Sequence, residues 1–250
     1  MRLFIALSLV CVLYSCDVKP GDDLFGGGNQ KRQSSDWFGE PITTKKTKRT
    51  SIKKERNNES QELTNAEKLL NHSVNIDVYF NGNPLSLGSG CFIKPNIVVT
   101  NFHVIEGGNE FKVTINSSGK TLNARLLKFD PIHDIALLKI ANYKSAHFLK
   151  LNTKFPRIGI DVLAAGSPEG ESGSISDGIV SAIRKSDPYD FDLIQFTASI
   201  SHGSSGGPII NDKLELIGIT VGSNSNDNAQ NLNYAIPAKY IWHLLDDENN

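Results

Sequence analysis

Residues 200–209 read ISHGSSGGPI, and the interpretation of the whole chain depends on this stretch. Two adjacent serines and three glycines fall within positions 203–208. A serine that attacks a carbonyl carbon needs an exposed Oγ and converging backbone N–H groups beside it, and glycine permits the dihedral angles of such a turn. In the pattern G-x-S-G-G the nucleophile is Ser205, and the N–H groups of Gly203 and Ser205 face the oxyanion. An ordinary Gly-Ser turn between two strands is the alternative.

A serine hydroxyl is a weak nucleophile, so this interpretation also requires a histidine base and a carboxylate that orients it. Among six histidines, His103 lies just after the apolar run IVVT, and Asp134 stands at the head of the apolar run IALLKI. Taken alone, His103 fits a capped loop histidine and Asp134 a turn-forming aspartate. Ser204 fits the nucleophile less well than Ser205, because it has no glycine two positions before it.

From Val74 onward, short runs rich in β-branched residues alternate with turns of Gly, Asn, Pro and Asp. Frequent short strands separated by turns predict an all-β sandwich or barrel. The less regular stretch 141–159 divides these runs into two sets, at about 74–140 and about 160–237. The sequence therefore predicts two small barrels joined by one connector.

Short helices are expected on both sides of this β-rich region. Apolar residues recur near a 3.6-residue period in 62–72, and 238–247 carries an apolar face. The folded domain is accordingly predicted at 62–247. The chain is 39% hydrophobic and 21% charged with a formal net charge of −1, so its overall charge does not indicate a nucleic-acid partner.

Six motifs occur in one order along the chain: GSGCFIKPNIVVTNFHVIEG, DPIHDIALLKI, GSPEG, SDGIVSAIR, HGSSGGPI and NYAIP. Together they resemble the trypsin-like serine proteases of the HtrA/Deg type, over about residues 74–240. This resemblance implies two six-stranded antiparallel β-barrels with the active site between them. It also implies that Ser205 attacks the peptide carbonyl, that His103 transfers its proton, and that Asp134 orients the imidazole.

The pocket for the side chain before the scissile bond is expected between residues 197–201 and 218–222. Neither stretch contains Asp or Glu, which argues against a preference for Lys or Arg and favours small or medium aliphatic side chains. The candidate lining residues are Ser199, Ile200, Ile219 and Thr220.

Several other residues receive structural interpretations. His202 is expected to be a partly exposed loop histidine, and Gly166 and Gly178 to be turn and loop glycines of the second barrel. Cys91 is expected to be a small buried apolar residue. The remaining histidines lack metal-ligand spacing and no phosphate-binding glycine loop occurs, so neither a metal nor a cofactor is expected.

The N-terminal residues 1–16, MRLFIALSLVCVLYSC, contain an apolar run that is too short to span a bilayer comfortably, which needs ~20 residues. The run fits the apolar region of a secretory signal. Its end, Leu13–Cys16, resembles the lipobox of bacterial lipoproteins, which implies cleavage before Cys16 and a lipid on its thiol. A lipid-anchored protein of the bacterial cell envelope, facing the periplasm or the exterior, is then expected. An ordinary signal peptide or a short anchor helix is the alternative.

Residues 17–61 contain few apolar side chains and are predicted to be a disordered, basic and Gly-rich linker. Within it, residues 45–56 read KKTKRTSIKKER, with seven basic residues and one acidic residue. This run is interpreted either as a solvated linker segment or as a contact with anionic lipid or a peptidoglycan-associated polymer.

These observations lead to two main functional hypotheses. The first is a serine endopeptidase that hydrolyses proteins of the cell envelope through an acyl-enzyme, with protein or peptide substrates as its partners. The second is a catalytically silent lipoprotein that binds peptides by adding them to a strand edge. A structural lipoprotein with accidental motif matches is a third. Because the sequence ends at Asn250 directly after the last expected helix, no PDZ domain is expected, and the oligomeric state stays open.

Overall fold

The computed structural model describes residues 63–167, 173–186, 190–223 and 232–246. The predicted signal peptide with Cys16 and the predicted linker at 17–61 lie outside these residues. None of the helices in the described part of the chain combines the length and the apolar character needed to span a bilayer.

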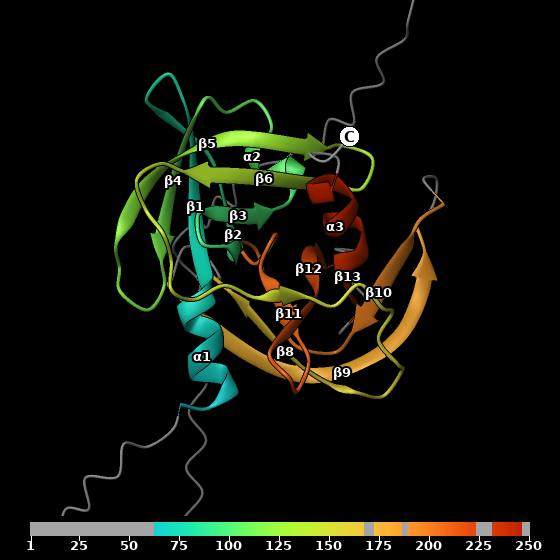
Figure 1. Cartoon of the computed structure of the whole chain (residues 1–250). Helices are drawn as coiled ribbons and strands as arrows, with labels where there is room; N and C mark the ends of the chain where they lie inside the picture. The colour runs from blue at the N-terminus through green and yellow to red at the C-terminus, as the bar shows by residue number, and fades with distance from the viewer. Residues whose placement is uncertain (1–62, 168–172, 187–189, 224–231, 247–250) are drawn as a thin grey trace, which may run out of the picture. The chain divides into compact units, whose positions relative to one another are not determined.

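The first six strands form a closed antiparallel barrel in the order β1-β2-β3-β6-β5-β4 (Figure 1). Every second residue of β1 is buried from Val74 to Val78, as expected for a strand with one face on the core. Asn81 and Gly82 join β1 to β2 with φ angles of 51° and 79°, which suit a tight two-residue hairpin turn. The strands are β1 Ser73–Phe80, β2 Asn83–Lys94, β3 Ile97–Thr100, β4 Glu110–Ile115, β5 Thr121–Asp130 and β6 Ile135–Ile140.

A second barrel follows in the order β11-β8-β9-β10-β13-β12, and the pairing of β11 with β12 closes it. The short strand β7 (Lys150–Leu151), in the connector between the barrels, adds to β12 in parallel. The prediction of two six-stranded antiparallel barrels is therefore confirmed. The strands of the second barrel are β8 Asp161–Gly166, β9 Ser174–Lys185, β10 Asp192–Phe196, β11 Pro208–Ile210, β12 Glu215–Ser223 and β13 Asn233–Pro237.

Both predicted flanking helices are present. The first, α1 (Asn65–His72), begins later than predicted because Thr64 and Glu67 form a capping box at its start. The last, α3 (Ala238–Asp246), packs against β12 and β13 and also reaches β5 of the first barrel (Figure 1). A third helix of one turn, α2 (Phe102–Ile105), follows β3.

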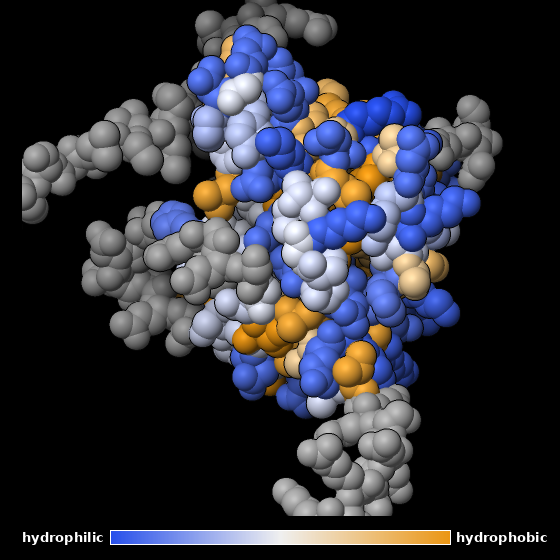
Figure 2. Space-filling model, turned by 90° about the vertical axis from the view of Figure 1, so that its left-hand side faces the viewer, coloured by the Kyte–Doolittle hydropathy of each residue, from blue (hydrophilic) through white to orange (hydrophobic). Residues whose placement is uncertain are grey.

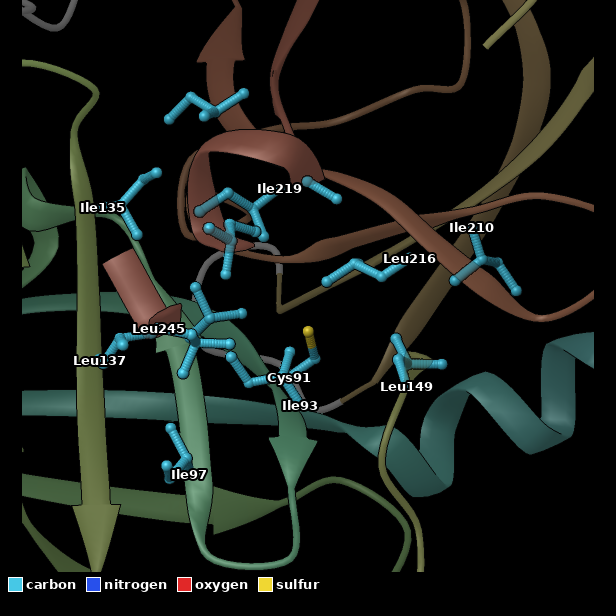
Figure 3. Packing of buried hydrophobic residues seen from close by; sticks show 14 of the residues in the cluster. Cys91, Ile93, Ile97, Ile135, Leu137, Leu149, Ile210, Leu216, Ile219 and Leu245 are labelled. Atoms are coloured by element: carbon cyan, nitrogen blue, oxygen red, sulfur yellow. The ribbon is translucent and has the colours of Figure 1, made fainter. Parts of the chain in front are cut away.

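The two barrels share a hydrophobic core. Cys91 and Leu137 from the first barrel lie in one cluster with Leu216 and Ile219 from the second and Leu245 from α3 (Figure 3). The expectation for Cys91 is confirmed, since its side chain is fully buried and burial raises the pKa of its thiol. The shared core fixes one barrel against the other, which matters because the candidate catalytic residues come from both.

The surface is mainly hydrophilic on the face shown in Figure 2, and its apolar side chains form separate patches. Scattered exposed apolar residues are normal for a protein surface and do not by themselves indicate a binding site.

Candidate active site

His103 and Asp134 meet because the strands that carry them are paired. His103 lies on α2 directly after β3, and Asp134 directly precedes β6. The antiparallel pairing of β3 with β6, which aligns Thr100 with Ala136, brings the end of one strand beside the start of the other. The two candidate residues therefore become neighbours although 31 positions separate them (134 − 103).

The Asp134 carboxylate holds His103 at two points. The backbone N–H of His103 donates to Oδ1 at 2.8 Å, and Nδ1 of the imidazole lies 2.7 Å from Oδ2. Because a carboxylate accepts hydrogen bonds, this contact favours, for the neutral imidazole, the tautomer with the proton on Nδ1 and the lone pair on Nε2. The His103 side chain is 44% exposed, so this nitrogen belongs to a side chain that solvent and substrate can reach.

Asp134 itself sits in an unusual backbone conformation. Its φ is +53°, in the left-handed region that Asp tolerates better than most residues. The carbonyl of Asp134 accepts a hydrogen bond from Nδ2 of Asn101, at 3.0 Å. Asn101 is fully buried just before α2, so it ties the backbone of Asp134 to the segment that carries His103.

Ser205 lies on the loop before β11, where glycine is required on structural grounds. Gly206 has a φ of +84°, and a Cβ there would lie 2.3 Å from both the Ser89 carbonyl oxygen and Oγ1 of Thr100. A Cβ on Gly207 would lie 2.1 Å from the carbonyl oxygen of Ala165. The glycines thus let the serine loop approach the backbone of both barrels.

This close approach places Ser205 beside the segment that carries His103. The carbonyl of Ser205 accepts a hydrogen bond from the Ser89 N–H at 2.8 Å. A Cβ built on Gly88 would lie 3.1 Å from the Ser205 carbonyl oxygen and 2.7 Å from Cγ1 of Val104, the residue after His103. The Ser205 hydroxyl donates to the carbonyl of Val221 at 3.4 Å, and among the described residues it makes no hydrogen bond with His103.

The candidate oxyanion loop is held by contacts to its carbonyl groups. Gly203 has a φ of +89°, and its carbonyl accepts a hydrogen bond from Oγ of Ser89 at 2.7 Å. The N–H of Ser204 donates to the Ser201 carbonyl at 3.0 Å. Within the described part of the chain, the N–H groups of Gly203 and Ser205 donate to no protein acceptor.

A pocket of about 270 Å³ is lined in part by this loop, through Ser201 and Ser204. It includes Ser199 and Ile200 of the predicted substrate pocket, but neither Ser205 nor Val221, the acceptor of the Ser205 hydroxyl. Ile219 and Thr220 are fully buried and do not line it. The complete lining is Ala164, Ala165, Gly166, Ser174, Ile175, Ser176, Ser199, Ile200, Ser201 and Ser204.

Residues 88–219, more than half of the chain, match the family described as "Trypsin-like peptidase domain". The chain belongs to this family. The expected resemblance to Deg-type proteases is confirmed by similarity to the serine endoprotease DegS of Haemophilus influenzae, which is 35% identical over 160 residues. The periplasmic serine endoprotease DegP of Escherichia coli is 34% identical over 168 residues.

These alignments cover 61% and 64% of this chain but only 47% and 35% of the two relatives, so the chain spans at most about half their length. Among solved structures, the serine endoprotease of Yersinia pestis matches with a TM-score of 0.62 and 27% identity, over 74% of this chain and 66% of that chain. The active form of a Mycobacterium tuberculosis protease matches with a TM-score of 0.66 and 22% identity, over 73% and 82%, and this second similarity supports the fold alone.

Two glycines of the peptidase domain have a different role from the one predicted. Gly166 ends β8 and Gly178 lies within β9, so their prediction as turn and loop glycines was wrong. A Cβ on Gly166 would lie 2.8 Å from Oγ of Ser204, and one on Gly178 would lie 2.2 Å from the backbone nitrogen of Ala198. Both are strand glycines at points of close backbone approach.

Sequence reasoning also missed Ser89, which links the two barrels at the site. Its buried hydroxyl donates to the Gly203 carbonyl and accepts the N–H of Ser167 at 3.0 Å. The only local signal is the run of small residues Gly88–Gly90 inside a strand-like segment. His202, by contrast, is exposed on the loop as expected. No group of three or more His, Cys, Asp or Glu side chains among the described residues is arranged to hold a metal ion.

Proposed function

We propose that the chain is a serine endopeptidase in which Ser205 is the nucleophile, His103 the base and Asp134 the residue that orients His103. The observation that carries this proposal is the two-point hydrogen bonding of His103 by Asp134, next to the glycine-bounded loop of Ser205. That contact selects the imidazole tautomer whose Nε2 can accept a proton.

The first chemical step requires the nucleophile to leave its hydrogen bond with Val221. The Ser205 hydroxyl leaves the carbonyl of Val221 and turns about its Cα–Cβ bond toward Nε2 of His103. As Oγ forms a bond to the carbonyl carbon of the substrate, its proton passes to Nε2. The carbon–nitrogen bond then breaks, the proton passes from His103 to the leaving amine, and Ser205 carries the acyl group until water removes it.

The oxyanion of the tetrahedral intermediate is stabilised by the N–H groups of Gly203 and Ser205. Neither group has a protein acceptor in the described part of the chain, which supports this role. One such donor typically contributes ~3 kcal/mol to transition-state stabilisation. Specificity is assigned to Ser199 and Ile200, which line the pocket, with small or medium aliphatic side chains preferred before the scissile bond; the fully buried Ile219 and Thr220, also predicted for this role, are not part of it.

The location proposed for the protein is the bacterial cell envelope. Its relatives include proteins named as periplasmic endoproteases, and a lipid on Cys16 would hold the enzyme at a membrane surface. The proposed substrates are proteins or peptides of that compartment.

A catalytically silent peptide-binding protein is the second candidate. The observation that favours it is the hydrogen bond of Ser205 to Val221 instead of His103. Cleavage of a diverse peptide library by the purified protein, with Ser205→Ala as the control, separates the two functions. The endopeptidase proposal predicts cleavage after aliphatic residues that Ser205→Ala abolishes. Absence of cleavage by the folded protein, with retained peptide binding, favours the second candidate.

A further inference from the structure

The turn between β5 and β6 that leads into Asp134 is fixed by a second histidine–aspartate pair. Oδ1 of Asp130 accepts the N–H groups of Ile132 and His133, at 2.9 and 3.1 Å. Its other oxygen lies 2.6 Å from Nδ1 of the His133 ring. These three contacts fix both the backbone of the turn and the orientation of the His133 ring, one residue before Asp134.

His133 is also part of an aromatic cluster, defined here as His133, Phe191 and Tyr240. The His133 ring stacks on Tyr240 with 4.3 Å between centroids and 22° between planes. Phe191 packs edge-on against both rings, at 5.0 Å from His133 and 5.6 Å from Tyr240. His133 belongs to the first barrel, Phe191 directly precedes β10 of the second, and Tyr240 lies on α3, so the cluster joins the barrels.

Tyr240 is itself anchored on the second barrel. Its hydroxyl accepts the backbone N–H of Asp192 at 3.0 Å. Nζ of Lys239 lies 3.3 Å from Oδ2 of the same aspartate and over the rings of Phe155 and Tyr240, at 3.9 and 4.6 Å from their centroids. The ring that His133 stacks on is therefore held by several independent contacts.

We propose that Tyr240 acts through His133 to hold Asp134 against His103, so that the aromatic cluster is a positioning device for the active site. The contacts that carry this inference run without a gap from Tyr240 through His133 to Asp134. Asp134 has a left-handed backbone conformation, which the residues around it must maintain. His133 directly precedes Asp134, so the position of His133 affects that conformation. Asn101 also fixes this backbone, because its Nδ2 donates a hydrogen bond to the Asp134 carbonyl. The inference rests on the proposed function, because the geometry it protects is that of the acid–base pair.

The test compares His133→Ala, Tyr240→Ala and the double variant with the wild-type protein. We expect kcat to fall roughly 10- to 100-fold in each single variant, as for a small misplacement of a catalytic group, with KM changed less than about twofold. Because both residues act through one contact, the double variant should be no worse than either single variant. His133→Phe and Tyr240→Phe keep the stacked rings and should stay within about threefold of wild type.

The second readout does not depend on turnover. The Nδ1 proton of His103 should give a downfield proton NMR signal in the wild-type protein, because it is hydrogen-bonded to Asp134. The signal should shift or vanish in His133→Ala and Tyr240→Ala and persist in both Phe variants. Trp242→Ala, on the same helix but 48% exposed, is the control and should leave kcat and the signal unchanged.

The inference is overturned if folded His133→Ala and Tyr240→Ala keep wild-type kcat and the wild-type signal, including the case in which only their melting temperatures fall. If the wild-type protein cleaves no peptide but the signal still responds to these variants, the proposed function fails and the positioning role stands.

Discussion

The two barrels contribute to the candidate site in different ways. The first barrel brings His103 and Asp134 together through the regular pairing of β3 with β6. The second presents Ser205 on an irregular loop, which is shaped by positive φ angles at Gly203 and Gly206 and by hydrogen bonds to Ser89 of the first barrel. Sheet register within the first barrel therefore brings the acid–base pair together, whereas the position of the nucleophile is set by close packing between the barrels.

The largest expected effect comes from breaking the contact between Asp134 and His103, which the pairing of β3 with β6 brings about. In Asp134→Asn, the amide can donate to Nδ1 of His103 and so favour the wrong tautomer, and kcat should fall ~10⁴-fold. Peptide hydrolysis measured at saturating substrate checks this value. The control is Asp161→Asn, an exposed carboxylate at the start of β8, which should retain wild-type kcat. A loss of less than tenfold in Asp134→Asn would contradict the assigned role.

The next prediction breaks the serine loop. In Gly206→Ala, the new Cβ would meet the Ser89 carbonyl and Thr100 at 2.3 Å, in addition to adopting a strained φ. We expect the free energy of unfolding to fall by about 3 kcal/mol or more, and activity to be lost with it. Denaturant unfolding measures the change.

Gly119→Ala is the matched control for this substitution. Gly119 also has a positive φ, +66°, but nothing lies within 4 Å of its Cβ position. Its cost should be about 1 kcal/mol, from backbone strain alone. Equal costs at Gly119 and Gly206 would show that packing between the barrels does not constrain the loop.

Removal of the Ser89 hydroxyl tests the link between the barrels. Ser89→Ala leaves the Gly203 carbonyl and the Ser167 N–H without their partner, which costs about 1–3 kcal/mol for each buried group left unsatisfied. We expect kcat to fall roughly tenfold with little change in KM, because the oxyanion loop loses a support. Steady-state kinetics measure kcat and KM of Ser89→Ala, and Ser118→Ala, at an exposed serine, is the control. An unchanged kcat would mean that the loop keeps its shape without Ser89.

The smallest predicted effect concerns pH. Burial opposes ionisation of Asp130, but hydrogen bonds from the His133 ring and from backbone N–H groups outweigh it, so the pKa of Asp130 is lowered. Because the folded-state pKa is below the unfolded value, this stabilisation is present above the unfolded pKa and is lost as the pH falls through the folded pKa. The melting temperatures of wild type and Asp130→Asn should therefore converge as the pH is lowered below the unfolded pKa of about 4. A constant difference would contradict the assignment.

The sequence supports the fold and the three candidate catalytic residues because their signals are local. Alternating strands, the serine–glycine turn, and the positions of His103 and Asp134 beside apolar runs are all visible within short windows. Contacts between distant segments leave no such pattern. The stacking of His133 on Tyr240, the bridge made by Ser89 and the close approach at Gly178 depend on how two barrels pack, which periodicity does not encode.

The predicted substrate pocket shows the same limit. Ile219 and Thr220 lie in β12. The side chain of Ile219 packs in the shared core, and the hydroxyl of Thr220 donates to the carbonyl of Ser204. The side chains of Ile219 and Thr220 are buried because β12 lies between β11 and β13. The sequence of residues 218–222 alone does not show this pairing, and by itself it predicts one side of the substrate pocket.

Reaction of the purified protein with a fluorophosphonate probe, with the adduct mapped by mass spectrometry, tests the central claim most directly. A covalent adduct on Ser205 is expected, absent from Ser205→Ala and formed much more slowly by His103→Ala. Folded wild-type protein that forms no adduct, or that carries the adduct on another serine, would contradict the account.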